Sequence, residues 1–179
     1  MISPRYHPLQ VALHWVSAVL VIGAWTVGAI VLERIPESEA GRKVVVLGAH
    51  MIAGLTIAFV MTLRLALRFT FEQPAPATSG NALLDRLAKL VHWALYVAAL
   101  AMAGSGLALA LQAGLPAILL SGGTVPPHEE LGRHAALGVH AVIGTILISL
   151  VFLHALAALW HQFVRKDGLM RRMGFGRVT

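Results

Sequence analysis

The stretch from Leu137 to Trp160 reads LGVHAVIGTILISLVFLHALAALW, and it lies within an uncharged run from His134 to Val164. About 20 apolar residues are enough for an α-helix to span the hydrocarbon core of a bilayer. This run is therefore long enough to cross a membrane, yet it contains His140 and His154. An imidazole is costly to bury in hydrocarbon unless a partner satisfies its ring nitrogens. The sequence thus predicts a transmembrane helix whose two histidines have a specific partner.

The composition places the whole chain in a membrane. Of its 179 residues, 58% are hydrophobic and 12% are charged, whereas a soluble domain is about a quarter charged. The chain has no cysteine, which excludes disulfides, thiolate zinc sites, iron–sulfur clusters and covalent heme attachment. Its formal net charge is +6, but the basic residues flank apolar segments. We therefore expect contact with membrane lipid and no binding to nucleic acid.

Four segments are long and apolar enough to span a bilayer. They predict a single all-α domain over 1–179, an integral membrane four-helix bundle with helices over about 11–32, 44–69, 90–111 and 135–163. Prolines and glycines punctuate the connections, as helix breakers should. The first segment is too long for the core of a signal peptide, so we expect it to be retained as a helix.

The distribution of Lys and Arg predicts the orientation of the bundle. Ten of these residues lie at the N-terminus, in the second connection and at the C-terminus, and four lie in the other two connections. Basic residues accumulate on the cytoplasmic side of membrane proteins. Both termini are therefore expected in the cytoplasm, and the first and third connections outside.

Depth in the membrane pairs four of the histidines. His140 and His154 are fourteen residues apart, which is nearly four helical turns, so they share one face at a separation of about 21 Å. With both termini inside, His14 lies at the cytoplasmic depth of His154. His50 lies at the outer depth of His140. Bundle sites are built from facing side chains on neighbouring helices, and two such sites are predicted.

Heme b is the cofactor that suits two facing histidines in an apolar bundle. Neutral imidazole is a good axial ligand, and the macrocycle is compatible with Leu, Val and Ala side chains. Zinc usually takes three or four protein ligands, and the four spans contain no Asp or Glu. Two histidines occupy both axial positions of an iron, so two hemes b that transfer electrons, rather than bind oxygen, are expected.

Three further residues lie near the predicted inner heme, and each has two interpretations. Arg64 and Arg68 are one turn apart at the cytoplasmic end of the second helix. They would compensate the heme propionates, or they would anchor the helix as ordinary cytoplasmic basic residues. His92 would make a helix-to-helix hydrogen bond or would contact a quinone.

Several stretches together resemble the bacterial diheme cytochrome b561 family over nearly the whole chain. They are PLQVALHW, LGAHMIAG, LRLALRF, LVHWALY, GVHAVIG and LHALAALWHQFVRKDGLMRRM. The resemblance implies heme ligands at His14, His50, His140 and His154, in the pairs already reached from topology. It also implies a multi-pass protein of the bacterial inner membrane.

The resemblance further implies an activity, that of a superoxide:quinone oxidoreductase. Superoxide would be oxidised at the outer face, and its electron would pass through the two hemes to ubiquinone at the inner side. His161, Arg5 and His92 are candidate quinone contacts because they should lie near the inner heme. The outer connections hold four basic and five acidic residues, a net charge of −1. Steering of superoxide would therefore need a local cluster that includes Arg42 and Lys43.

Two other functions compete with this interpretation. One is a cytochrome b subunit that relays electrons between the quinone pool and a dedicated protein partner. Short connections without a docking domain favour the oxidase over this relay. The other is a small transporter without heme, which a colourless purified protein would indicate.

Overall fold

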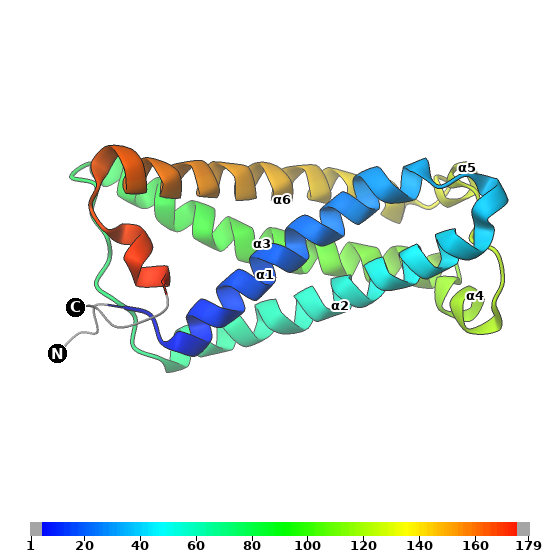
Figure 1. Cartoon of the computed structure of the whole chain (residues 1–179), viewed down its shortest axis with the longest axis horizontal. Helices are drawn as coiled ribbons and strands as arrows, with labels where there is room; N and C mark the ends of the chain where they lie inside the picture. Colours follow the sequence, from blue (N-terminus) through cyan, green and yellow to red (C-terminus); the bar gives the residue numbers. More distant parts are fainter. Residues whose placement is uncertain (1–4, 175–179) are drawn as a thin grey trace.

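The computed structural model describes residues 5–174, and four long helices dominate it (Figure 1). Each is long and apolar enough to cross a membrane; with their short extensions they span Pro8–Arg34, Glu37–Thr70, Ala82–Gln112 and Ala135–Arg165. No strand occurs in residues 5–174. The predicted all-α membrane fold is therefore confirmed.

The first helix, α1 (Pro8–Thr26), begins at a proline. Proline suits this position because the first helical residues have no intrahelical acceptor for their N–H groups. The side chain of His7 caps the helix by accepting a hydrogen bond from the Leu9 N–H at 3.2 Å. After Thr26 the chain continues as a π-helical turn, η1 (Val27–Val31), which is a geometry that is frequent at functional positions.

Short turns connect α1 to the second helix. The 3-10 turns η2 (Leu32–Arg34) and η3 (Glu37–Glu39) precede α2 (Ala40–Thr70). Pro36 lies between the two turns in an extended conformation, which separates the first membrane helix from the second.

The third helix, α3 (Ala82–Gln112), starts eight residues before the predicted position near residue 90. Its start is explained by capping. The Asn81 side chain accepts hydrogen bonds from the N–H groups of Leu83 and Leu84, and the Asp85 carboxylate accepts from the Ser79 N–H at 2.7 Å. The Asn81 cap satisfies two of the first N–H groups of the helix and favours its formation there, while the Asp85 carboxylate ties the preceding turn to the helix.

Two short helices connect α3 to the last long helix. They are α4 (Leu115–Ser121) and α5 (His128–Leu131), and they precede α6 (Ala135–Trp160). Gly114 and Gly122, at the two ends of α4, have φ values of 63° and 70°, in the left-handed region that glycine adopts at least cost. The chain then forms a π-helical turn, η4 (His161–Arg165), and a 3-10 segment, η5 (Leu169–Met173).

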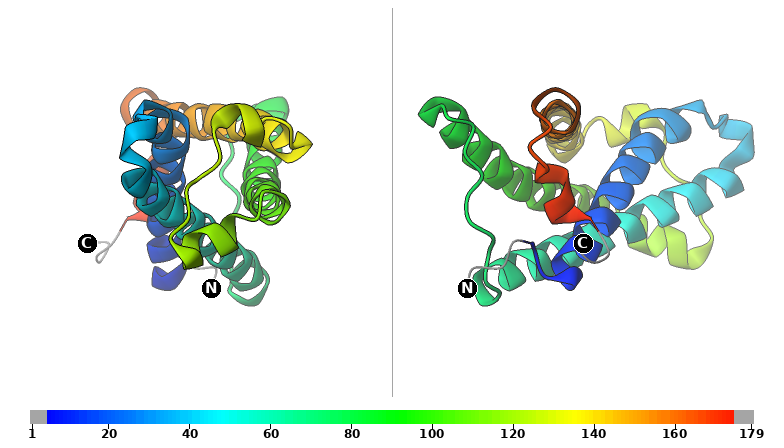
Figure 2. Two further views of the ribbon diagram at one scale, coloured as in Figure 1. Left: turned by 90° about the vertical axis from the view of Figure 1, so that its right-hand side faces the viewer. Right: turned by 60° about the vertical axis from the view of Figure 1, so that its left-hand side comes forward.

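The four long helices surround a common axis, as the end-on view in Figure 2 shows. α3 packs against both α2 and α6, and α1 packs against α2. All four contribute to the buried core, which consists of Val21, Ile57, Met61, Ala98, Ala99 and Leu147. Many large apolar side chains point outward instead, such as Val19 at 70% exposure and Phe59 at 68%, and these suit contact with lipid.

The bundle has two distinct ends. α1 begins and α6 ends at the same end, together with η5, and we call this the terminal end (Figure 1). The opposite end carries η3, α4 and α5, and we call it the loop end.

Candidate functional site

Two histidines face each other near the loop end, from two helices that both pack against α3. His50 lies on α2 and His140 on α6, and their ring centroids are 6.3 Å apart with an angle of 81° between the planes. Both side chains are half-buried. The predicted outer pair is therefore brought together by the fold.

A second pair lies near the terminal end. His14 of α1 and His154 of α6 have ring centroids 6.1 Å apart and planes at 72°. A histidine nitrogen lies about 2 Å from a metal that it ligates, and the ring centre lies about 1 Å further back, so two rings on one metal are about 6 Å apart. Both pairs have this spacing. Among residues 5–174, no group of three or more His, Cys, Asp or Glu side chains forms a site that could hold a metal ion.

Two glycines, on the helices that carry neither loop-end histidine, lie against the rings of His50 and His140. A Cβ atom added to Gly28 would lie 2.8 Å from His50 Cε1, and one added to Gly106 would lie 2.9 Å from His140 Cε1. Gly28 is in η1 and Gly106 is in α3. Sequence reasoning missed both residues. The available signal was a glycine within a helix, where it costs about 1 kcal/mol relative to alanine and so indicates a packing requirement.

The two loop-end imidazoles differ in their polar contacts. The Ser105 hydroxyl donates its one hydrogen to the Met102 carbonyl at 2.9 Å and lies 3.0 Å from His140 Nδ1. When the hydroxyl donates to the Met102 carbonyl, it can accept only from His140 Nδ1–H, and that tautomer keeps a lone pair on Nε2. His50 Nδ1 is buried and makes no hydrogen bond in the described residues, although the Ala24 carbonyl is near the ring.

The terminal-end pair has a cation beside it. Arg64 of α2 places Nη2 3.0 Å from His14 Nδ1, and a guanidinium can only donate. Its Nη1 donates to the hydroxyl of Ser17, a buried residue, and its Cζ lies 5.7 Å from the centre of the Tyr96 ring. None of the ion pairs within residues 5–174 involves Arg64. This half-buried charge thus has only neutral partners in the described chain.

The other predicted residues of the inner site lie at the terminal end as well. The ring centroid of His92 on α3 is 5.2 Å from that of His154, which is a direct ring contact rather than the spacing of two ligands on one metal. Arg68 lies over Trp93 at 5.5 Å. Arg5 is half-buried and precedes α1 by three residues.

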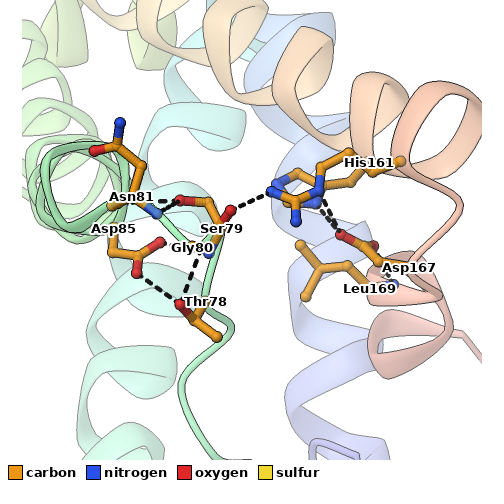
Figure 3. Close-up of polar contacts among 9 residues, drawn as sticks. Thr78, Ser79, Gly80, Asn81, Asp85, His161, Asp167 and Leu169 are labelled. Atoms are coloured by element: carbon orange, nitrogen blue, oxygen red, sulfur yellow. Dashed lines mark hydrogen bonds and ion pairs between the residues drawn. The ribbon is translucent and has the colours of Figure 1, made fainter.

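His161 takes part in a polar cluster at the surface of the terminal end (Figure 3). Its Nδ1 lies 2.5 Å from Asp167 Oδ2. The hydrogen bond from His161 is the main reason that the pKa of Asp167 is below its ordinary value, and the Leu169 N–H adds to the effect. Arg165 donates to the Ser79 carbonyl at 2.8 Å, which ties the end of α6 to the chain before α3.

The segment after α6 folds back against this end of the bundle. The indole Nε1 of Trp15 donates to the Met173 carbonyl at 2.9 Å, and Arg172 donates to the Ala75 carbonyl at 2.6 Å. Beside the cluster lies a surface pocket of about 420 Å³, lined by Gln162, Phe163, Lys166, Asp167, Gly168 and Arg171.

Arg42 and Lys43, the candidates for superoxide steering, lie in the first turn of α2 at the loop end. Each is paired with an acid: Arg42 with Glu39 at 2.9 Å, and Lys43 with Glu37 at 2.5 Å. The Arg42 side chain is 62% exposed and that of Lys43 is 14% exposed. The positive charges of Arg42 and Lys43 are therefore largely compensated by the two glutamates of η3, just before α2.

Comparison with known proteins identifies the family of the chain. The family model described as prokaryotic cytochrome b561 matches residues 5–176. The chain belongs to the prokaryotic cytochrome b561 family. It is thus a multi-pass bacterial membrane protein of electron transfer, from a family that binds heme b.

Individual relatives of this cytochrome match along almost their whole length. The probable superoxide oxidase CybB of Yersinia pestis is 28% identical, with 94% of this chain and 95% of the relative covered. Cytochrome b561 homolog 1 of Escherichia coli K12 is 27% identical, with 94% and 96% covered. Cytochrome b562 of Cereibacter sphaeroides is 28% identical, with 96% of each chain covered.

Proposed function

We propose that the chain holds two hemes b, one between His14 and His154 and the other between His50 and His140. The observation that carries this proposal is the occurrence of two histidine pairs, each with the spacing of axial ligands on one iron. Nδ1 of His140 lies 3.0 Å from the Ser105 hydroxyl, and a hydrogen bond at that nitrogen leaves Nε2 of the same ring for the iron. Bound heme supplies a reversible one-electron carrier.

Arg64 fits the same proposal at the terminal end. A guanidinium at this depth without a counter-charge is costly, and the propionates of a heme would provide one. A carboxylate would compete with His14 for Arg64 because a charge-assisted hydrogen bond to an anion is stronger than one to a neutral ring. His14 would then keep its hydrogen on Nδ1 and ligate through Nε2. This favours propionate binding over simple anchoring for Arg64.

The two sites together provide a route across the membrane. His140 and His154 are fourteen residues apart on one helix, so the two iron layers are about 21 Å apart. Hemes held by these histidines would supply two electron carriers at successive depths of the bundle. We propose that the terminal end is cytoplasmic, because it carries nine of the thirteen Lys and Arg residues within 5–174, and that the protein resides in the inner membrane.

We propose that superoxide donates electrons at the loop end and that ubiquinone accepts them at the terminal end. Two superoxide anions yield two molecules of oxygen and two electrons, and these electrons with two protons convert the quinone to quinol. The pocket next to the cluster of His161 and Asp167 is lined by Gln162, Lys166 and Arg171, whose N–H groups can donate hydrogen bonds to a quinone at that end. The matching relative with a superoxide oxidase name gives the donor its support.

An electron relay between the quinone pool and a protein partner is the second candidate. It uses the same two hemes and differs only in the donor or acceptor. The paired charges of Arg42 and Lys43 favour it, because they leave little net attraction for an anionic substrate at the loop end.

The test starts from an anaerobic spectrum of the purified protein with quantification of heme, for which two per chain are expected. Pulse-radiolysis or stopped-flow mixing then measures reduction by superoxide, with and without bound quinone, and quinol is added in a parallel experiment. Prompt reduction by superoxide, followed by reoxidation when quinone is present, is the expected result. Hemes that stay oxidised with superoxide but are reduced by quinol would leave the relay in place of the oxidase.

A further inference from the structure

Two glycines in the described helices lie directly against histidine rings. They belong to η1, which extends α1, and to α3, and these are the helices that provide no ligand to the loop-end pair. At Gly28 and at Gly106 an added Cβ would approach a ring carbon to 2.8 and 2.9 Å, whereas real Cβ contacts essentially never fall below 3.0 Å. The ring or the helix would have to shift to accept even a methyl group.

Other glycines on the same helices do not have this property. A Cβ added to Gly23 of α1 or to Gly104 of α3 would meet no atom within 4 Å outside its own helix backbone. The contact is therefore specific to the two positions that face His50 and His140. Close helix packing along α1 and α3 does not explain it.

We propose that Gly28 and Gly106 are positioning residues that hold the imidazole planes of His50 and His140 near the observed 81°. This inference rests on the proposed ligation of heme by these two histidines. Each ring is confined on one side by the helix that carries a glycine, so its rotation about the bond to Cβ is limited. A methyl group at either position pushes the ring out of the orientation that ligation needs.

The two positions are not equivalent. His140 is also held by the hydroxyl of Ser105 at 3.0 Å, while His50 Nδ1 has no hydrogen bond in the described residues. Packing against Gly28 is thus the main restraint on His50, and the ring of His140 has two restraints. Gly28→Ala should therefore disturb the loop-end site more than Gly106→Ala.

The experiment compares Gly28→Ala with Gly23→Ala and Gly106→Ala with Gly104→Ala in the full-length holoprotein. Heme is quantified per chain, and electron paramagnetic resonance of the oxidised protein is recorded, because the low-spin iron signal depends on the angle between the two axial imidazole planes. Gly28→Ala should lose up to half of the heme or shift one of the two signals. Gly106→Ala should give a smaller change of the same signal. The Gly23 and Gly104 variants should match the wild type.

Equal spectra and equal heme content for all four variants would overturn the inference. Equal loss of the loop-end and the terminal-end heme would also overturn it, because that result would indicate a general packing defect. If Gly28→Ala does not accumulate in the membrane, the comparison of Gly106→Ala with Gly104→Ala decides in the same way. Failure of the proposed function is distinguishable, because the wild type itself would then lack two bis-histidine signals.

Discussion

The loop-end and terminal-end histidine pairs have nearly the same spacing, 6.3 and 6.1 Å between ring centroids, but different surroundings. At the loop end the rings lie against glycines and one neutral hydroxyl. At the terminal end a guanidinium contacts the ring of His14. The same ligand geometry is thus reached in one place by steric fit and in the other beside a charge. We therefore expect the loop-end site to be sensitive to changes in side-chain size and the terminal-end site to be sensitive to changes in charge.

The largest expected effect is the loss of one heme when any one of the four proposed ligands is replaced. His50→Ala and His140→Ala should each remove the loop-end heme, and His14→Ala and His154→Ala should each remove the terminal-end heme, because an iron with one axial histidine is held weakly. Heme per chain should fall by half in each variant. The measurement is heme content together with redox difference spectra, which should fall into two matching sets.

His92→Ala is the matched control for this experiment, because its ring contacts that of His154 at 5.2 Å without the spacing of a ligand pair. It should keep both hemes. If His92→Ala lost a heme while His14→Ala retained two, the terminal-end pair would be His92 with His154, and the assignment by depth would be wrong.

A smaller effect is expected from the charge of Arg64. A unit charge about 8 Å from the electron, at an effective dielectric constant of about 20, stabilises the reduced state by about 2 kcal/mol, which is about 90 mV for one electron. Arg64→Met should therefore lower the midpoint potential of the terminal-end heme by up to this amount and leave the loop-end heme nearly unchanged. Spectroelectrochemical titration measures both potentials.

Arg64→Lys keeps the positive charge and should restore most of the potential, although it cannot make the same set of hydrogen bonds. Equal shifts at both hemes, or no shift in Arg64→Met, would mean that the charge of Arg64 is not coupled to the nearer site. Arg64 would then be an anchoring residue only.

The sequence predicts the histidine pairs well because depth in a membrane is a one-dimensional quantity. Counting residues from the ends of each span places His14 beside His154 and His50 beside His140 without any knowledge of helix packing. The same reasoning could not find Gly28 or Gly106, because a close approach between helices depends on their rotation and crossing. The start of α3 at Ala82, before the predicted position near residue 90, has another reason: the Asn81 cap and the bond from the Ser79 N–H to Asp85 favour a helix there in spite of the low hydrophobicity of its first turns.

The smallest expected effect concerns the outer surface of the loop end. Removing positive charge there with the double variant Arg42→Gln and Lys43→Gln should slow the reaction with superoxide, because Glu39 and Glu37 then lose their ion-pair partners and repel the anion. Because exposed charges are screened within about 10 Å at 0.1 M ionic strength, the effect should be clearest at low salt. Reduction of the hemes by quinol at the opposite end should be almost unaffected.

The matched control for this last prediction changes the total charge equally at the other end of the bundle. Arg86→Gln with Lys89→Gln alters two exposed basic residues in the first turns of α3, at the terminal end, and should not change the rate with superoxide. If both double variants slow the reaction by the same factor, superoxide responds to the total charge of the protein and not to the local charge of Arg42 and Lys43. If neither double variant slows the reaction at low salt, Arg42 and Lys43 do not attract superoxide. Their ion pairs with Glu39 and Glu37 would then be the reason.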